Sequence, residues 1–393
     1  MSADSALGAP AVHEVPLEPA AEAVVFCGVD KPFERVAVPD VLLREGELLA
    51  QIELATVCGS DLRTVAGERL AQVPLVLGHE QVGRVVAFGP GSPARASDGS
   101  ELRIGDRIVW AVAIDCGACR MCRRGIPNKC EQLHKYGHER MRRGWELSGG
   151  VATHTHLQPR TTIVRVPEHL PAQVLAPASC ATATIMAAVE AAEEIRPLRG
   201  EIVVVSGCGM LGLTAIAAAR GAGATVVAVD VDSSRRELAR RFGAEAAASP
   251  GVRAVRSAIA DAAARRPDWG GSGRVGFGVA FELSGAEGSV QTLLECSDVG
   301  AAIVLAGSVF PAPSVPLSAE LVVRGLLTIR GVHNYRPEHL ERAVRFLQAA
   351  DASLFAQLVA DIVPFAHAEF ALTTHAVRGT RVGVRPDWPQ MQP

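Results

Sequence analysis

Residues 202–212 read IVVVSGCGMLG, and this stretch decides the fold of the second half of the chain. Its first four residues are apolar in succession, which is typical of a parallel strand buried on both faces. Gly207, Gly209 and Gly212 then follow with the G-x-G-x-x-G spacing of a dinucleotide-binding turn. An Ala-rich helical stretch continues to Arg220, so strand, turn and helix occur in the expected order. We therefore expect a doubly wound parallel sheet of the Rossmann type.

The same region predicts how a dinucleotide is held. Glycines let the backbone approach the pyrophosphate, and the start of a helix supplies free N–H groups. Asp230 ends the next apolar run, residues 225–229, near the spacing expected for the acid that accepts from the ribose hydroxyls. A carboxylate there repels a 2′-phosphate, so NAD is favoured over NADP, although Arg235 and Arg236 nearby keep the preference open. The predicted cofactor-binding residues are Gly207, Gly209, Met210, Leu211, Gly212, Asp230 and Arg235.

The first half of the chain has a different pattern. Residues 50–54 alternate apolar and polar side chains, as a half-buried strand does, and Gly, Pro and Asp clusters separate them from a second apolar run at 107–114. Many short strands with Gly-rich turns favour a β-barrel-like domain. Residues 1–23 are rich in Ala, Pro and Glu without clean periodicity, and we expect a flexible N-terminal arm there.

Length and composition limit the number of domains, the possible partners and the expected location of the protein. A chain of 393 residues with 48% hydrophobic side chains is long enough for two cores. The net charge of -3 argues against a nucleic-acid or membrane partner. Residues 1–23 lack both Lys and Arg and have no apolar core of a secretory signal, so we expect a cytoplasmic protein.

A run of four cysteines, CGACRMCRRGIPNKC, begins at Cys116 and ends at Cys130. Its C-x2-C-x2-C-x7-C spacing is suited to one tetrahedral Zn²⁺ held by Cys116, Cys119, Cys122 and Cys130. A site closed by four thiolates is structural and performs no chemistry. Disulfides are the competing interpretation, and they are not expected in the cytoplasm.

Two further residues suggest a second metal site. Cys58 lies in VCGSD just past a predicted strand, and His79 lies in GHEQVG. A thiolate together with an imidazole is typical of zinc chemistry, although either residue alone is more often a buried or hydrogen-bonded side chain.

These segments, taken in order with the four-cysteine lobe and the glycine turn, resemble the zinc-containing medium-chain alcohol dehydrogenases from about Val24 to the C-terminus. The resemblance implies a GroES-like β-barrel catalytic domain at 24–180 and 333–393, with the structural zinc lobe at 116–130. It implies an NAD-binding Rossmann domain at 181–332. It also implies Zn²⁺ at two sites per chain, NAD, a small alcohol or carbonyl substrate, and a homodimer or homotetramer.

The resemblance also implies residue roles. Cys180, in PASCAT, is expected as the third ligand of a catalytic zinc with Cys58 and His79, leaving an open fourth position. Asp61 and Glu80 match residues that hold the ligands, and Ser60 matches the hydroxyl that receives the proton of the alcohol.

One departure concerns Arg63, which stands where many relatives carry a histidine at the outer end of a proton relay. A guanidinium is no base near neutral pH, so the proton leaves through water or a ribose hydroxyl, or Arg63 contacts an anion. The segment from Lys129 to Gly150 is similar to a bacterial subgroup associated with phosphonate metabolism. In that interpretation Arg63, Lys135 and His138 are candidate substrate contacts for a phosphonate; otherwise they are ordinary solvated side chains.

The sequence therefore predicts a zinc-dependent, NAD-linked alcohol dehydrogenase for a small alcohol, with a hydroxyalkyl phosphonate as one candidate. Two other classes stay open: a relative that binds a dinucleotide as a sensor without catalysis, and a zinc-ribbon binding protein. Three other cysteines, Cys27, Cys208 and Cys296, are expected to be packing residues.

Overall fold

The apolar runs of the second half form one parallel sheet in the computed structural model, which describes residues 11–91, 94–265, 275–311 and 313–387. Its strand order is β13-β12-β11-β14-β15-β16, which is the order 3-2-1-4-5-6 of a doubly wound dinucleotide-binding fold. The glycine turn follows the central strand β11, where such folds bind their ligand. This sheet belongs to the second of two compact units, Cys180–Leu354.

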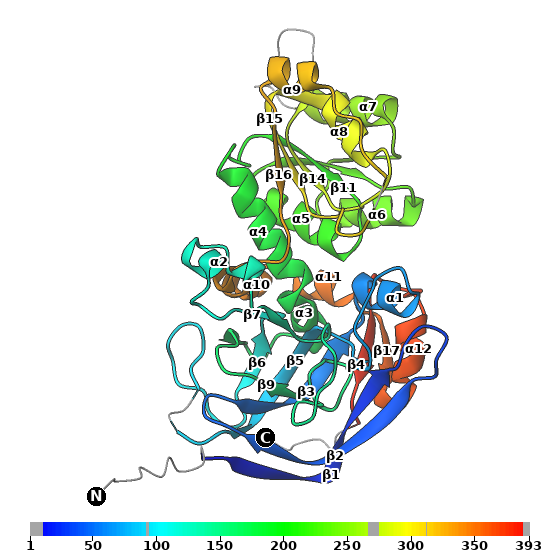
Figure 1. Cartoon of the computed structure of the whole chain (residues 1–393). Helices are drawn as coiled ribbons and strands as arrows, with labels where there is room; N and C mark the ends of the chain where they lie inside the picture. The colour runs from blue at the N-terminus through cyan, green and yellow to red at the C-terminus, as the bar shows by residue number, and fades with distance from the viewer. Residues whose placement is uncertain (1–10, 92–93, 266–274, 312, 388–393) are drawn as a thin grey trace, which may run out of the picture. The chain divides into compact units, whose positions relative to one another are not determined.

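Helices cover both faces of this sheet, with α4 and α5 on one side and α7 and α8 on the other (Figure 1). The strands of the unit are β11 (Ile202–Ser206), β12 (Thr225–Val229), β13 (Ala246–Ala248), β14 (Phe277–Glu282), β15 (Ser297–Leu305) and β16 (Thr328–Gly331). The helices are α4 (Ala181–Glu193), α5 (Met210–Gly221), α6 (Ser233–Arg241), α7 (Val252–Ala264), α8 (Ser289–Cys296), α9 (Ala319–Gly325) and α10 (Pro337–Ala349). Buried apolar side chains of β11, β14, α7 and α8 share one core, as the continuous apolar runs predicted.

The first unit combines residues 1–179 with 355–393 and is built mainly from antiparallel strands. A larger sheet has the order β10-β6-β5-β3-β18-β17, with β9 also pairing with β3, and a smaller one has the order β2-β1-β4. The strands are β1 (His13–Phe26), β2 (Glu34–Leu43), β3 (Leu48–Thr56), β4 (Leu75–Val76), β5 (Glu80–Phe88), β6 (Arg107–Trp110), β7 (Ala113–Ile114), β8 (His134–Lys135), β9 (His154–Leu157), β10 (Ile163–Arg165), β17 (Asp361–Pro364) and β18 (Val382–Arg385). The short helices are α1 (Gly59–Val65), α2 (Arg120–Arg123), η1 (Pro127–Lys129), α3 (Ala172–Leu175), η2 (Ala176–Ser179), η4 (Phe365–His367) and α12 (Ala368–Thr373), and α11 (Ala352–Ala356) crosses the boundary of the units.

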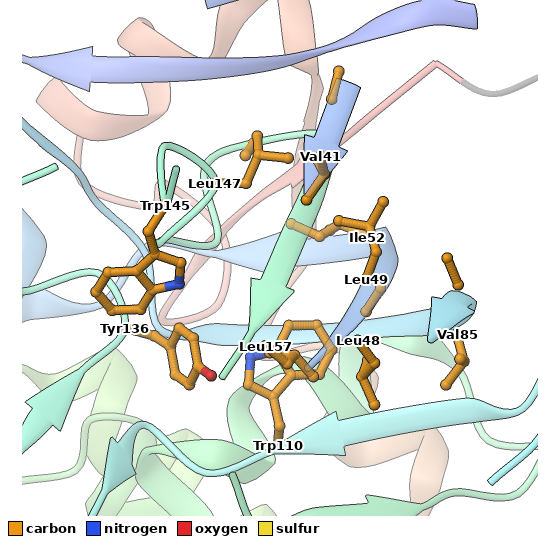
Figure 2. Close-up of a cluster of buried hydrophobic side chains, with 14 of the residues drawn as sticks. Val41, Leu48, Leu49, Ile52, Val85, Trp110, Tyr136, Trp145, Leu147 and Leu157 are labelled. Atoms are coloured by element: carbon orange, nitrogen blue, oxygen red, sulfur yellow. The ribbon is translucent and has the colours of Figure 1, made fainter. Parts of the chain in front are cut away.

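The core of the first unit lies between these sheets. Figure 2 shows side chains of β2, β3, β5, β6 and β9 converging with aromatic residues of the loops. Tyr136 and Trp145 meet edge to face with ring centroids 5.8 Å apart, and the indole N–H of Trp145 donates to the carbonyl of His156 at 2.9 Å. The loop that follows the four-cysteine lobe is therefore fixed by core packing.

The N-terminal arm requires a correction. Residues 13–23 belong to strand β1, whereas residues 1–10 lie outside the described part of the chain. Pro16 and Pro19 hid this strand, because proline is rare in paired strands. The register of β1 against β2 shifts between Pro16 and Ala21, and this irregularity accommodates the prolines.

The boundary at residue 332 is also corrected, because α10 stays with the second unit, which runs to Leu354. Glu190 of α4 explains this. Its carboxylate binds three side chains of the α10 region, namely Arg336, His339 and Arg342, with His339 Nε2 at 2.9 Å. Since these partners are distant in sequence, no local pattern revealed the contact.

Among the described helices, none alone has the length and apolar character needed to cross a membrane. One bent pair, Ala172–Ser179 with Ala181–Glu193, passes by length and composition only.

Candidate metal centre and dinucleotide turn

Cys58 and His79 come from two neighbouring strands of the first unit. Cys58 follows β3 and caps the N-terminus of α1, and His79 immediately precedes β5. Because β3 and β5 pair antiparallel with Thr56 opposite Glu80, the end of one strand lies beside the start of the other. Both side chains are buried, with Cys58 8% and His79 2% exposed.

Cys180 completes the group. It directly follows Ser179, the last residue of the first unit, whose hydroxyl donates to the carbonyl of His79 at 3.0 Å. One ligand atom each of Cys58, His79 and Cys180 lies within 4.8 Å of the other two. Two thiolates and an imidazole form a soft donor set that fits Zn²⁺.

Asp61 connects the segments that carry two of these ligands. Its fully buried carboxylate accepts from the backbone N–H of Cys58 at 2.9 Å and of Gly78 at 3.4 Å, and lies 3.3 Å from Nδ1 of His79. Burial opposes a positive charge on His79, but Asp61 and Cys58 outweigh it and raise the pKa of His79 to about 10. The pocket therefore favours a cation, which a metal ion would supply.

Glu80, which follows His79, carries a second buried carboxylate. Glu80 accepts from the hydroxyl of Thr56 at 2.7 Å and from Nε of Arg381 at 3.0 Å. Nη2 of Arg381 also lies 3.6 Å from Sγ of Cys58. Burial raises the pKa of Glu80, and the charge of Arg381 opposes that rise.

Sequence reasoning missed Arg381. It is 301 positions from Glu80, and the pairing of β18 with β3 brings the C-terminal segment to this site. The available signal was chemical, since a carboxylate buried beside a metal ligand needs a cation, but that signal did not say which arginine supplies it.

Ser60 and His138 both lie against His79. Oγ of Ser60 is 3.4 Å from Nε2 of His79. The ring centroid of His138 is 4.5 Å from that of His79, and Nδ1 of His138 donates to the carbonyl of Tyr136 at 2.8 Å. Burial lowers the pKa of His138 well below its usual value, so this ring is neutral. The hydroxyl of Ser60 and the ring of His138 therefore both lie beside the candidate metal ligand His79.

The other candidate substrate contacts are arranged differently. Arg63 is exposed and forms an ion pair with Glu68 at 3.8 Å. Lys135 is half-buried in β8, and its backbone N–H donates to Glu139 at 2.6 Å. Its positive charge acts on His138. Of the expected trio, His138 therefore lies against His79 and is affected by the charge of Lys135, whereas Arg63 is exposed and ion-paired.

The four-cysteine lobe forms a second group whose sulfur atoms lie within 4.8 Å of one another: Cys116, Cys119, Cys122 and Cys130. Short turns point backbone N–H groups at the sulfurs, with Cys116 N–H donating to Cys130 Sγ and Cys119 N–H donating to Cys116 Sγ, both at 3.3 Å. The N–H groups of Glu131 and Cys122 lower the pKa of Cys119 to about 6. Four thiolates fit one tetrahedral Zn²⁺ and leave no ligand position for a substrate.

The three glycines of the turn after β11 have three different environments. Gly207 has φ +97°, which L side chains rarely adopt. A Cβ at Gly212 would lie 1.7 Å from the carbonyl oxygen of Gly207, so the start of α5 packs directly on the turn. A Cβ at Gly209 would meet nothing within 4 Å. This combination of tight turn, open backbone and close packing fits a pyrophosphate at the start of α5.

Asp230 lies at the end of β12, as predicted, and is buried. Its carboxylate accepts from the N–H of Cys208 at 2.7 Å and of Asp232 at 2.9 Å. It therefore holds the glycine turn against the second strand. Arg236 donates to the carbonyl of Asp230 at 2.8 Å, whereas Arg235 is exposed.

The three remaining cysteines lie outside both groups. Cys208 and Cys296 are buried and Cys27 is half-buried. This agrees with their expected role in packing.

Comparison with known proteins identifies the class to which this architecture belongs. The sequence matches the alcohol dehydrogenase GroES-like domain over residues 44–168 and the zinc-binding dehydrogenase family over residues 211–349. An L-threonine 3-dehydrogenase of Anaeromyxobacter dehalogenans is 30% identical over 312 residues, covering 77% of this chain and 79% of that protein. The chain therefore belongs to the zinc-containing medium-chain alcohol dehydrogenase family.

Other relatives agree. An L-threonine 3-dehydrogenase of Streptomyces coelicolor is 31% identical over 75% of this chain and 79% of that protein. The crystal structure of an alcohol dehydrogenase from Thermotoga maritima has a TM-score of 0.83 and 28% sequence identity, over 93% of this chain and 99% of that one. Membership accounts for a GroES-like and a Rossmann part together, which a zinc-ribbon binding protein would not require. The likeness to the phosphonate subgroup stays a prediction.

The glycine turn generates a first prediction. Gly209→Ala places a methyl group in open space, so we expect a thermal midpoint within about 2 °C of the parent and NADH binding weakened at least about tenfold. Gly212→Ala is the comparison variant. It should lower the free energy of unfolding by about 2 kcal/mol or more, because the backbone must move to make room for the methyl group. Thermal unfolding and fluorescence titration with NADH measure both effects. Unchanged NADH affinity in Gly209→Ala would contradict the assignment.

The lobe generates a second prediction. Cys119→Ser should lower the thermal midpoint by several degrees while activity per folded molecule stays close to that of the parent, because this metal closes a loop. Cys27→Ser is the control, since it removes a thiol outside both groups. If Cys119→Ser abolishes turnover with no change in thermal midpoint, the roles of the two cysteine groups are reversed.

Proposed function

We propose that the chain is a zinc-dependent, NAD-linked dehydrogenase that oxidises a small primary or secondary alcohol to the aldehyde or ketone, or catalyses the reverse. The observation that carries the proposal is the group of Cys58, His79 and Cys180, whose ligand atoms lie within 4.8 Å of one another. Family membership supports the reaction class. The cofactor and the residue roles are inferred from the site, and the substrate candidates come from the relatives and from the sequence.

In this proposal Cys58, His79 and Cys180 hold one zinc ion, and the four cysteines of the lobe hold a second. Bound zinc would polarise the oxygen of the alcohol, and the nicotinamide would accept a hydride. Asp61 keeps His79 oriented through Nδ1, and Arg381 lies against the sulfur of Cys58. These two residues position the ligands and do not touch the substrate.

The reaction removes a hydride from the carbinol carbon and a proton from the oxygen, so that the alcohol and NAD⁺ give the carbonyl compound, NADH and one proton. Ser60 is the group we assign to receive the proton, because its hydroxyl lies 3.4 Å from Nε2 of His79. Arg63 cannot continue the relay as a base, since it stays protonated and pairs with Glu68. The proton therefore passes to water or a ribose hydroxyl.

Two substrate candidates have separate support. The relatives named as L-threonine 3-dehydrogenases favour L-threonine. The resemblance of residues 129–150 to the phosphonate-associated subgroup favours a hydroxyalkyl phosphonate. A screen of small alcohols that includes both, followed by NADH absorbance, discriminates between them.

A third prediction tests the catalytic site. Cys58→Ala and His79→Ala should each lower turnover by at least about a thousandfold, because an incomplete site cannot hold the metal in working geometry. Each variant should keep one zinc per chain, in the lobe. Cys27→Ala is the matched control and should retain turnover and two zinc ions. Wild-type turnover in a variant verified to lack the second zinc would contradict the assignment. One zinc in the parent, without turnover, would favour an inactive relative.

A fourth prediction concerns cofactor choice. Asp230 should make kcat/KM higher with NAD than with NADP, because a 2′-phosphate would approach this buried carboxylate. Asp230→Ser should lower the ratio of kcat/KM with NAD to kcat/KM with NADP several-fold, because Arg235 is then available to bind the 2′-phosphate. Asp230→Asn keeps the size of the side chain but leaves one oxygen for the two backbone N–H groups of Cys208 and Asp232, so its thermal midpoint measures the disturbance of the turn. A parent that uses both cofactors equally, or variants with an unchanged ratio, would exclude Asp230 as the discriminating residue.

A further inference from the structure

Arg69 lies in the loop that follows α1, close to the candidate metal ligands. The loop turns back on the helix, because the backbone N–H groups of Glu68 and Arg69 both donate to the carbonyl of Arg63, at 2.9 and 3.1 Å. Nη1 of Arg69 reaches the hydroxyl of Thr64 at 3.4 Å. The hydroxyl of Thr64 in turn donates to the carbonyl of Ser60 at 2.8 Å. The guanidinium therefore lies over the face of α1 that carries Thr64 and Ser60.

The positions of Thr64 and Ser60 on α1 set the distance between the guanidinium of Arg69 and the hydroxyl of Ser60. Residues four apart on a helix have Cβ atoms about 5–6 Å apart, so the guanidinium of Arg69 lies about one turn from the hydroxyl of Ser60. Oγ of Ser60 is also 3.4 Å from Nε2 of His79. A molecule with its reacting oxygen at Ser60 would thus have its neighbouring carbons near Arg69.

The charge of Arg69 is not matched by an ion pair. Within the described residues, no carboxylate lies within 4.0 Å of its guanidinium, although the side chain is half-buried. Arg63 and Arg381 differ, because they pair with Glu68 and Glu80. The negative groups that act on Arg69 are Asp61 and Cys58, which belong to the metal centre itself. The guanidinium of Arg69 therefore has no direct carboxylate partner among the described residues, and its N–H groups are available to the anion of a ligand.

Lys135 supplies a second positive charge that acts, like that of Arg69, on His138. The charges of Arg69 and Lys135 both act on the neutral ring of His138, which stacks on His79. Nδ1 of His138 is occupied by the carbonyl of Tyr136, so its Nε2 has the lone pair and adds no charge. Arg69 and Lys135 therefore give the surroundings of His138 a positive potential.

We propose that Arg69 binds an acid group of the substrate, a carboxylate or a phosphonate, carried one or two carbons from the reacting hydroxyl. This inference rests on the proposed function and narrows its substrate class to hydroxy acids. A guanidinium suits the task, because its planar N–H groups bind two oxygens of one anion. It also differs from the sequence analysis, in which Arg63 was the arginine considered as a candidate contact for an anion.

The kinetic test compares a neutral alcohol with two acids of similar size: butan-2-ol, 3-hydroxybutyrate and 2-hydroxypropylphosphonate. With the zinc-loaded parent and NAD, at least one acid should exceed butan-2-ol about tenfold in kcat/KM, and the preferred acid distinguishes carboxylate from phosphonate. Arg69→Gln should raise KM for that acid at least about tenfold and change kcat/KM for butan-2-ol less than about twofold. Arg69→Lys should recover part of the loss. Arg95→Gln removes an exposed arginine that pairs with Glu101, and it should change neither KM for the acid nor kcat/KM for butan-2-ol.

A binding test is independent of turnover. Acetate and methylphosphonate are titrated calorimetrically into the zinc-loaded protein, and the preferred anion should bind the parent and Arg95→Gln but bind Arg69→Gln at least about tenfold more weakly. The inference is overturned if Arg69→Gln lowers kcat/KM equally for the acid and for butan-2-ol, or if that variant binds the anion as tightly as the parent does. It is also overturned if Arg63→Gln, and not Arg69→Gln, loses the acid substrate. Turnover of butan-2-ol without any preference for an acid also overturns it but leaves the proposed function standing. Absence of all turnover overturns the proposed function, and the titration then decides on Arg69.

Discussion

The buried carboxylate of Asp61 is the constraint on which the rest of the metal centre depends. A carboxylate with no exposure is tolerated only when hydrogen bonds replace its water, and here the backbone N–H groups of Cys58 and Gly78 do so. These donors belong to the two segments that carry the ligands, so one side chain fixes the distance between Cys58 and His79. Gly78 is required for this approach, because it has φ +94° and a Cβ would lie 2.8 Å from the backbone of Val151.

The pair of Glu80 and Arg381 extends this arrangement to the C-terminal segment. Glu80 is on β5 and Arg381 immediately precedes β18, so the ion pair ties together strands that flank β3. A buried ion pair contributes little net stability, but loss of one partner leaves an uncompensated charge. Because the guanidinium also contacts the sulfur of Cys58 at 3.6 Å, it favours the thiolate that a metal requires. The return of the chain to the first unit therefore has a chemical consequence at the site.

Much of this could be predicted from local sequence, because the informative features are short. The strand and glycine turn at 202–212 occupy a few consecutive residues, and the four cysteines lie within fifteen. What escaped prediction depends on contacts between distant residues. The prolines of β1 concealed its pairing with β2, and α10 was separated from α4 because nothing local signals that Glu190 binds His339. Arg381 and Arg69 look like ordinary arginines until the fold places one beside Glu80 and turns the other back over Thr64.

In the proposed enzyme, one chain holds two zinc ions in two different environments, one of them formed by Cys58, His79 and Cys180. The most direct test is an anomalous difference map from crystals of the purified protein, with data collected on both sides of the zinc absorption edge. Two zinc peaks per chain are expected, one among the ligand atoms of Cys58, His79 and Cys180 and the other among the four sulfurs of the lobe. A single peak in the lobe, in protein that oxidises an alcohol, would contradict the assignment of a zinc site to Cys58, His79 and Cys180.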